Sequence, residues 1–228
     1  INPNHMNAHN NLGIIFQELG EIQKAKGCYE KVIEINPNHM NAYNNLGIIF
    51  QELGNLQKAK DCYEKAIEIN PNYSNAYNNL GTIFQELGEN QKAKDCYEKA
   101  IEINPNYVEA YWNMHTMTAN IDDALIVLNK IDKIDDKHIK AKIMISAIEG
   151  FKGNFDSFNN LLSSPDSNHP FIRSIKWVFS LPKLPKIFFN RYNFFDAIIT
   201  SSEISRPFYE FGVWNGVAFR YLIKTHTL

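Results

Sequence analysis

Residues Ile35–Glu68 read INPNHMNAYNNLGIIFQELGNLQKAKDCYEKAIE, and the flanking stretches 1–34 and 69–102 align with them without a gap. Each flanking stretch differs from the quoted one at only five of 34 positions. A period of this length is typical of stacked supersecondary units, in which each unit packs on its neighbours instead of closing a core of its own. The sequence therefore predicts a repetitive fold of at least three units.

Each unit divides into two amphipathic helices, because apolar residues recur at spacings of three and four. Gly54 is expected to end the first helix, and 70–72, Asn-Pro-Asn, to form the turn into the next unit. Neither helix buries its apolar stripe alone, whereas stacked copies do. In the quoted copy the two stripes are Ala42, Leu46, Ile49, Phe50 and Leu53, and then Ala59, Tyr63, Ala66 and Ile67.

These positions resemble the signature of the tetratricopeptide repeat. The resemblance implies an all-α fold, a right-handed superhelix or α-solenoid. It also implies that Gly47 and Ala59 are small because two helices cross closely there, and that Tyr63 fills the space between units. The signature residues are Tyr43, Leu46, Gly47, Phe50, Ala59, Tyr63, Ala66 and Pro71, then Tyr77, Leu80, Gly81, Phe84, Ala93, Tyr97, Ala100 and Pro105, and, with His9 and Val32 as departures, Leu12, Gly13, Phe16, Ala25, Tyr29 and Pro37.

The pattern divides the chain into four parts: residues 1–118 form the array of three repeats and the start of a fourth, 119–164 degenerate helical repeats, 165–206 linker helices, and 207–228 a different domain. Asn120 is expected to cap a helix over 121–131. Further helices are expected at about 137–150 and 154–163, separated by Gly153. Their apolar face comprises Ile139, Ile143, Ile148, Phe155, Phe158 and Leu162. Because residue 1 aligns with a seam between repeats, we interpret the chain as a fragment of a longer array.

Composition excludes several functions. The net charge of −2 argues against a general nucleic-acid binder. No apolar run reaches the length of a membrane span and no signal peptide opens the chain, so we expect a cytoplasmic protein without membrane contact. The three cysteines, Cys28, Cys62 and Cys96, occupy one position of the repeat and have no metal-ligand spacing. We expect small, partly buried thiols and no metal site.

The tail contains E-x-G-x-x-x-G at Glu210–Gly216, after a short β-prone run and before a helical pattern. With its flanking residues it resembles the first motif of class I S-adenosylmethionine-dependent methyltransferases, in particular the macrocin O-methyltransferase group. The resemblance implies that Gly212 and Gly216 let the backbone approach the cofactor and that Glu210 lies beneath it. Only about 22 residues follow Arg206, too few for that fold. We therefore expect no catalytic residue and no cofactor for this chain, S-adenosylmethionine only in a longer parent enzyme, and here a lone strand and helix packed on the last repeats.

A row of asparagines recurs on the first helix of every unit although asparagine is a poor helix former: Asn11, Asn45, Asn79 and Asn113. The row resembles the asparagine ladder of O-linked N-acetylglucosamine transferase, which implies that these amides line a concave face and bind an extended peptide backbone. Two alternatives stay open: the residues were copied with the repeat, or they bond one repeat to the next.

The functional hypothesis is therefore an interaction scaffold for a protein or peptide ligand, with self-association through the open ends of the array as a further expectation. The alternative is that the array is the substrate-recruiting or oligomerising arm of a methyltransferase.

Overall fold

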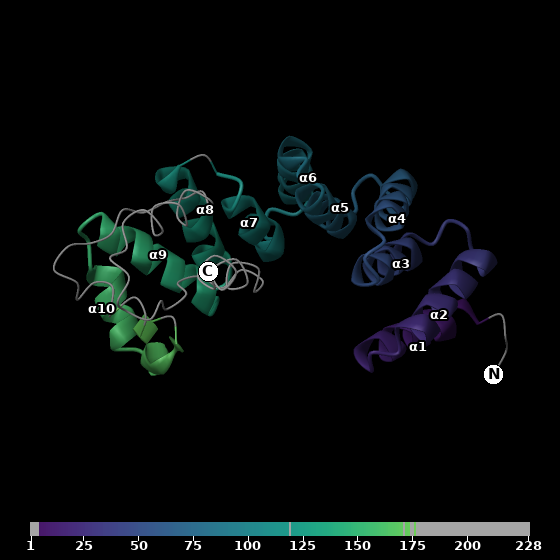
Figure 1. The fold of residues 1–228 in the computed structure, drawn as a ribbon, viewed down its shortest axis with the longest axis horizontal. Helices are drawn as coiled ribbons and strands as arrows, with labels where there is room; N and C mark the ends of the chain where they lie inside the picture. The colour runs from purple at the N-terminus through teal and green to yellow at the C-terminus, as the bar shows by residue number, and fades with distance from the viewer. Residues whose placement is uncertain (1–4, 119, 171, 174–175, 177–228) are drawn as a thin grey trace, which may run out of the picture. The chain divides into compact units, whose positions relative to one another are not determined.

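A computed structural model describes residues 5–118, 120–170, 172–173 and 176 of the chain. These residues are helical and contain no strand, as the sequence predicted (Figure 1). They group into two units, Ile1–Thr118 and Ala119–Leu228, which are described separately. The helices are α1 (Met6–Glu18), α2 (Ile22–Ile35), α3 (Met40–Glu52), α4 (Leu56–Ile69), α5 (Ser74–Glu86), α6 (Asn90–Ile103), α7 (Val108–His115), α8 (Ile121–Ile134), α9 (Ile139–Phe151), α10 (Asp156–Leu162) and a 3₁₀ turn over Pro165–Asn168.

The first unit is a stack of helix pairs. The two helices of a repeat pack on each other, α1 on α2, α3 on α4 and α5 on α6, and the second helix of each repeat packs on the first helix of the next. Successive pairs can be followed from α1 to α6 in Figure 1. This arrangement is that of an α-solenoid, because each described helix of this unit packs on its neighbours in sequence.

Each first helix ends in the same glycine turn. Gly20, Gly54 and Gly88 have φ angles of 72°, 73° and 77°, the left-handed region that favours glycine. The amide of Gly54 donates to the carbonyl of Gln51 (2.9 Å), and the amide of Asn55 donates to that of Phe50 (2.8 Å). These two bonds form a Schellman motif, which satisfies the last carbonyls of the helix. Leu53, expected in the core, is 46% exposed instead because it is the capping residue at which the chain turns away.

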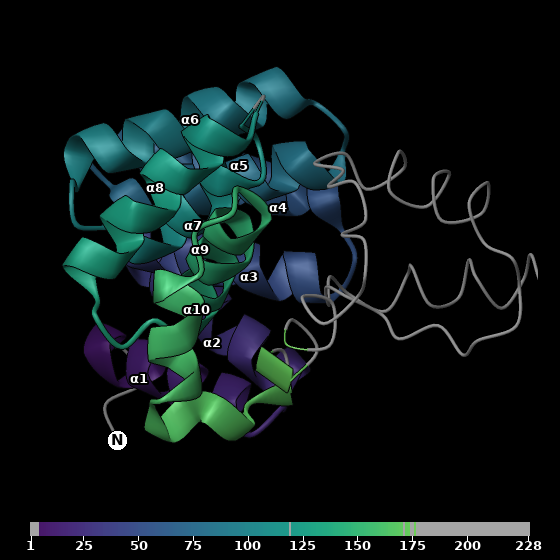
Figure 2. The same cartoon turned by 90° about the vertical axis from the view of Figure 1, so that its left-hand side faces the viewer.

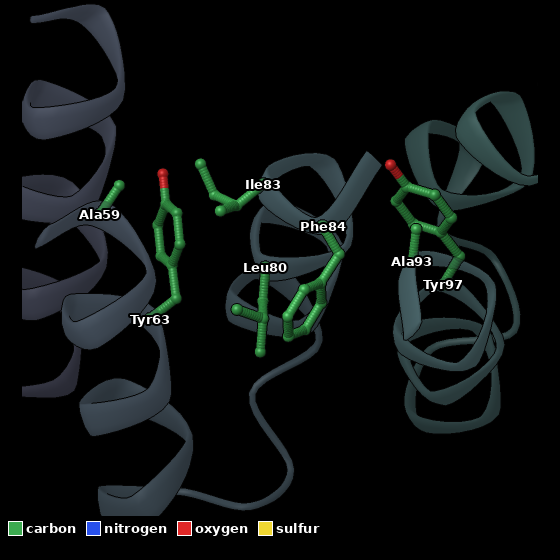
Figure 3. Packing of buried hydrophobic residues seen from close by; sticks show 7 residues of the cluster. All are labelled: Ala59, Tyr63, Leu80, Ile83, Phe84, Ala93 and Tyr97. Atoms are coloured by element: carbon green, nitrogen blue, oxygen red, sulfur yellow. The ribbon is translucent and has the colours of Figure 1, made fainter. Parts of the chain in front are cut away.

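The core of the first unit lies at the joints between repeats. Tyr63 of α4 is fully buried and shares a cluster with Leu80 and Ile83 of the following helix α5 (Figure 3). The prediction that Tyr63 fills the space between units is confirmed. The explanation for Gly47 is more specific than the predicted helix crossing, because the ring of Tyr63 itself occupies the space beside this glycine.

The first repeat differs from its copies in one respect. Leu46 and Ile49 of α3 are 6% and 0% exposed, since α2 packs on this helix. Their counterparts in α1, Leu12 and Ile15, are 36% and 49% exposed. Among the described residues, no second helix of another repeat packs on α1 as α2 packs on α3.

The second unit contains α8, α9 and α10 (Figure 2). Asn120 caps α8 as predicted, since its Oδ1 accepts a hydrogen bond from the amide of Asp123 (2.9 Å), but the helix runs on to Ile134. Gly153, with a φ of 90°, separates α9 from α10. Phe155 was wrongly assigned to the apolar face and is 37% exposed, because it precedes α10 as the cap residue. The buried cluster instead comprises Ile143, Phe158, Leu161 and Ile172.

Several predictions concern residues outside the described part of the chain. They include most of the linker helices expected over 165–206 and the tail over 207–228. Within the described residues, no helix is both long and apolar enough to cross a membrane.

Candidate functional site

The asparagines of the predicted ladder lie on the first helices of the first unit. In the first three repeats a second asparagine stands directly before the ladder residue. Asn45 and Asn79 are half-buried, whereas the preceding Asn44 and Asn78 are 5% and 7% exposed. The predicted ladder contains the more exposed member of each pair and not the more buried one. The repeated Asn-Asn dipeptide was the available signal.

These amides are joined from repeat to repeat. Nδ2 of Asn79 donates to Oδ1 of Asn44 in the preceding repeat (2.9 Å), and Nδ2 of Asn113 donates to Oδ1 of Asn78 (3.0 Å). Within a repeat, Asn44 and Asn78 donate more weakly, each over 3.4 Å, to the asparagine that follows. The result is a continuous line of five amides, running from Asn45 to Asn113, which is the arrangement that the inter-repeat alternative predicts.

The line does not extend into the first repeat. Asn11 is exposed, and Oδ1 of Asn10 is buried without a hydrogen-bond partner among the described residues. Asn10 corresponds to Asn44 and Asn78, whose Oδ1 atoms each accept a bond from the next repeat. A buried acceptor without a donor costs free energy, so this end of the line favours an additional donor.

A second line of hydrogen-bonded side chains, which the sequence did not predict, runs along the same helices. Nε2 of Gln17 donates to Oε1 of Glu52 (3.0 Å), and Nε2 of Gln51 donates to Oε1 of Glu86 (2.7 Å). Gln85 continues the line to Oγ1 of Thr116 (3.4 Å). The signal in the sequence was the Gln-Glu dipeptide that ends each first helix.

The glutamines are oriented by the buried tyrosines. The hydroxyl of Tyr29 donates to Oε1 of Gln17 (3.2 Å), and that of Tyr63 donates to Oε1 of Gln51 (3.3 Å). Burial raises the pKa of Tyr29 to about 12, and it raises the pKa of Tyr63 as well. Both hydroxyls are therefore protonated donors at neutral pH. Each hydroxyl binds the side-chain carbonyl oxygen of its glutamine, and the amide nitrogen of the same glutamine donates to the glutamate of the next repeat.

The thiols of the cysteines, like the tyrosine hydroxyls, have pKa values that burial raises. Burial raises the pKa of Cys62 and of Cys96 to about 11, with Asp61 and Asp95 as smaller contributions. A thiol with so high a pKa is protonated at neutral pH and is a poor nucleophile or metal ligand. Cys62 is buried and the other two are half-buried, as predicted.

The predicted cofactor residues Glu210, Gly212 and Gly216 lie outside the described residues, so S-adenosylmethionine binding by a longer protein stays a prediction. Within the described part of the chain, no group of three or more His, Cys, Asp or Glu side chains is placed to hold a metal ion. The arrangement that the structure does contain is two parallel lines of hydrogen-bonding side chains on the first helices.

Comparisons with known proteins agree with the fold. PilF of Pseudomonas aeruginosa superposes with a TM-score of 0.64 at 17% identity, over 69% of this chain and 73% of that chain. YrrB, described as a TPR protein with an unusual peptide-binding site, gives 0.56 at 21% identity, over 77% and 94%. MamA gives 0.54 at 25% identity, over 64% and 86%. No curated protein sequence matches the chain significantly.

The family model described as Tetratricopeptide repeat matches residues 4–70 and 39–106, a little under half of the chain. The two matches overlap and together span the three copies found in the sequence. They do not reach the tail at 207–228. The matched stretch is the same one whose helices pair and stack in the first unit, so the family match and the packing of the helices agree for residues 4–106.

Proposed function

We propose that the first unit binds an extended peptide along its first helices, with the asparagine line as the contact to the peptide backbone. The observation that carries this proposal is the direct bonding of amides between repeats, Asn79 to Asn44 and Asn113 to Asn78. It arranges hydrogen-bonding groups of consecutive repeats in one row and fixes their orientation before any ligand arrives. Preorganisation of this kind lowers the entropy that binding would otherwise lose.

The amides retain hydrogen-bonding capacity after their bonds to one another. A primary amide has two donor hydrogens and two acceptor lone pairs. Asn79 donates one hydrogen to Asn44 and accepts one bond from Asn78, which leaves one donor and one acceptor site. Since a peptide backbone also offers alternating donors and acceptors, a half-buried amide row suits it without selecting a particular sequence.

The row therefore has two roles that do not exclude each other. The bonds between Asn44, Asn78 and their partners hold neighbouring repeats in register, because their Oδ1 atoms are buried acceptors that need donors. The remaining capacity of Asn45 and Asn79, and the exposed amide of Asn11, face a ligand. A tetratricopeptide array that acts as a scaffold needs both a rigid stack and a binding face.

Selection from an unbiased library of twelve-residue peptides, with the 228-residue chain immobilised, tests the proposal. Selected peptides should bind in solution, and the double variant Asn11→Ala/Asn45→Ala should bind them about tenfold more weakly, as the loss of two hydrogen bonds implies. Asn11 is exposed, whereas Asn45 accepts a weak bond from Asn44 and forms a side-chain hydrogen bond with Tyr29 of the first repeat, so circular dichroism must show that the double variant is still folded.

The matched control removes two amides from the turns instead, with Asn38→Ala/Asn72→Ala. Both of these asparagines are exposed and lie in the turn after a second helix. The control should bind the selected peptides as tightly as the unaltered chain. Equal weakening by both double variants, or selection of no binding peptide at all, would overturn the proposal.

A further inference from the structure

Charge is divided between the two kinds of helix in the first unit. All nine lysines of residues 1–104 lie on second helices, and this stretch contains no arginine. The first helices α1, α3 and α5 carry no lysine, and each ends in one glutamate: Glu18, Glu52 and Glu86. Over α1, α3 and α5, the face that we propose as the peptide site therefore carries three glutamates and no lysine or arginine.

The lysines pair with glutamates of their own helices or lie over phenylalanine rings of the first helices, and they do not neutralise these three glutamates. Lys26 pairs with Glu30 (3.2 Å) and Lys60 with Glu64 (3.6 Å), both at a spacing of four residues along one helix. Lys58 lies 5.4 Å from the ring centroid of Phe50. Among the described residues, no ion pair includes a glutamate that ends a first helix. The three carboxylates are thus available to a cationic partner.

The carboxylates lie on the same face as the asparagine row. Glu52 follows Asn45 by seven residues, two turns of helix, and Glu86 follows Asn79 by the same interval. All three glutamates are exposed. Gln17 and Gln51 each donate one hydrogen bond to the glutamate of the next repeat, which holds the carboxylate in place while leaving most of its acceptor sites unused.

The acceptor at Asn10 lies at the end of the row that, within the described part of the chain, has no bond from the next repeat. Its buried Oδ1 has no hydrogen-bond partner among the described residues, at the end of the row where Asn11 is exposed. The face thus combines three exposed carboxylates with a row of amides that begins at Asn10, whose counterparts accept their bonds from the next repeat. A ligand rich in donors and positive charge complements it, and an acidic ligand does not.

The repeat spacing restricts the ligand further. Because the amides of Asn44 and Asn79 touch, the first helices of consecutive repeats lie side by side, at the usual separation of roughly 8–10 Å. A polyproline II chain rises about 3.1 Å per residue with three residues per turn, so every third side chain points the same way at about 9.3 Å. Side chains on one face of a β-strand recur every second residue, at about 6.6 Å, and do not match.

We propose that the ligand of this face is a basic peptide in polyproline II conformation, with a lysine or arginine at every third position. Successive cationic side chains bind Glu18, Glu52 and Glu86, and the peptide backbone between them bonds to the asparagine amides. This inference rests on the proposed peptide-binding function and adds the charge and spacing of its ligand.

The test uses four synthetic peptides that are labelled at one end and measured by fluorescence anisotropy at low salt. Three carry four lysines at every second, third or fourth position among alanine and proline, and one carries glutamate at every third position. The peptide with lysine at every third position should bind at least fivefold more tightly than the other lysine peptides. The glutamate peptide should not bind.

Two triple variants assign the contact. Glu18→Gln/Glu52→Gln/Glu86→Gln keeps an acceptor for the glutamine line and should weaken binding of the third-position peptide at least tenfold. The control Glu30→Gln/Glu64→Gln/Glu98→Gln makes the same change in net charge on the second helices and should change affinity less than twofold. Circular dichroism confirms that both variants stay folded.

The outcomes separate the two proposals. Equal affinity for all three lysine spacings, or equal weakening by both triple variants, overturns this inference. The lysine peptides would then be attracted by the net negative charge of the chain and not by the three glutamates. If library-selected peptides bind through the asparagines while the lysine peptides do not, the inference fails and the proposed function stands. If neither kind of peptide binds, both fail.

Discussion

The ring of Tyr63 occupies the space in which a side chain at Gly47 would begin. A Cβ atom on Gly47 would lie 2.6 Å from Cε1 of Tyr63, far inside ordinary van der Waals contact. The same relationship recurs between Gly13 and Tyr29 and between Gly81 and Tyr97. Glycine on the first helix and tyrosine on the second are therefore one packing unit, repeated three times.

Gly47→Ala should destabilise the chain by roughly 1–3 kcal/mol, since an added methyl group forces the buried ring to move. Gly27→Ala is the matched control, because Gly27 lies within α2 and a Cβ there meets nothing within 4 Å. It should stabilise by up to about 1 kcal/mol through helix propensity alone. Denaturant titrations measure the free energy of unfolding of both variants. An unchanged value for Gly47→Ala would contradict the close packing of the Tyr63 ring against Gly47.

Tyr63→Ala should cost roughly 3–5 kcal/mol, as for other large buried side chains. Tyr63→Phe should cost only about 1 kcal/mol, because it keeps the ring and loses the hydrogen bond to Gln51. Free energies of unfolding in urea distinguish the two contributions. A loss below about 1 kcal/mol for the alanine variant would mean that the ring is not part of the core.

Asn79→Ala and Asn113→Ala should each lower stability by about 1–3 kcal/mol, since each leaves a buried Oδ1, on Asn44 or Asn78, without its donor. Asn11→Ala should be neutral or slightly stabilising, because its amide is exposed and alanine is the better helix former. Thermal melts without ligand compare the three. Similar melting temperatures for all would show that the bonds between repeats contribute nothing.

Stability should fall at alkaline pH. The pKa of Cys62 is raised from 9.0 to about 11 and that of Tyr29 from 10.0 to about 12, chiefly by burial. Below their ordinary pKa values both groups are protonated in the folded and the unfolded chain. As the pH rises from 9 to 12 the unfolded chain ionises first, so the free energy of unfolding falls.

Guanidinium titrations at stepped pH measure this fall. Cys62→Ala should lose less stability than the unaltered chain between pH 9 and 11, and the comparison removes the common effect of lysine titration. Curves that stay parallel over this range would show that the thiol is not buried in the folded chain.

The 228-residue chain should bind S-adenosylmethionine weakly or not at all. The glycine motif expected over 210–216 would by itself supply only one wall of a pocket, whereas small-molecule sites enclose most of their ligand. Isothermal titration calorimetry measures the affinity. Micromolar binding that disappears in Gly212→Val would instead identify a cofactor site in this tail.

The sequence by itself determined the repeat length, the helix pairs, the glycine turns and the position of Tyr63 between repeats. Each of these depends either on local periodicity or on a residue type, such as glycine, that favours one backbone conformation. A glycine such as Gly54 directly after a helical pattern marks the end of the helix. Apolar residues at spacings of three and four share one face of a helix but not of a strand. The same reasoning placed Asn120 as a cap, since the bond from Asp123 to its side chain is local.

Only the tertiary structure decided which polar side chains meet between repeats. Asn44 and Asn79 are 35 residues apart, and their bond depends on how closely α3 and α5 pack. Leu46 is buried and Leu12 is 36% exposed because, among the described helices, only Leu46 has the second helix of a preceding repeat packed on it, although α1 and α3 differ in sequence only at His9 and Tyr43. The glutamine–glutamate line likewise needs the stacking of one repeat on the next. Periodicity within a repeat fixes each helix, but contacts between repeats follow from packing geometry that the repeat alone does not contain.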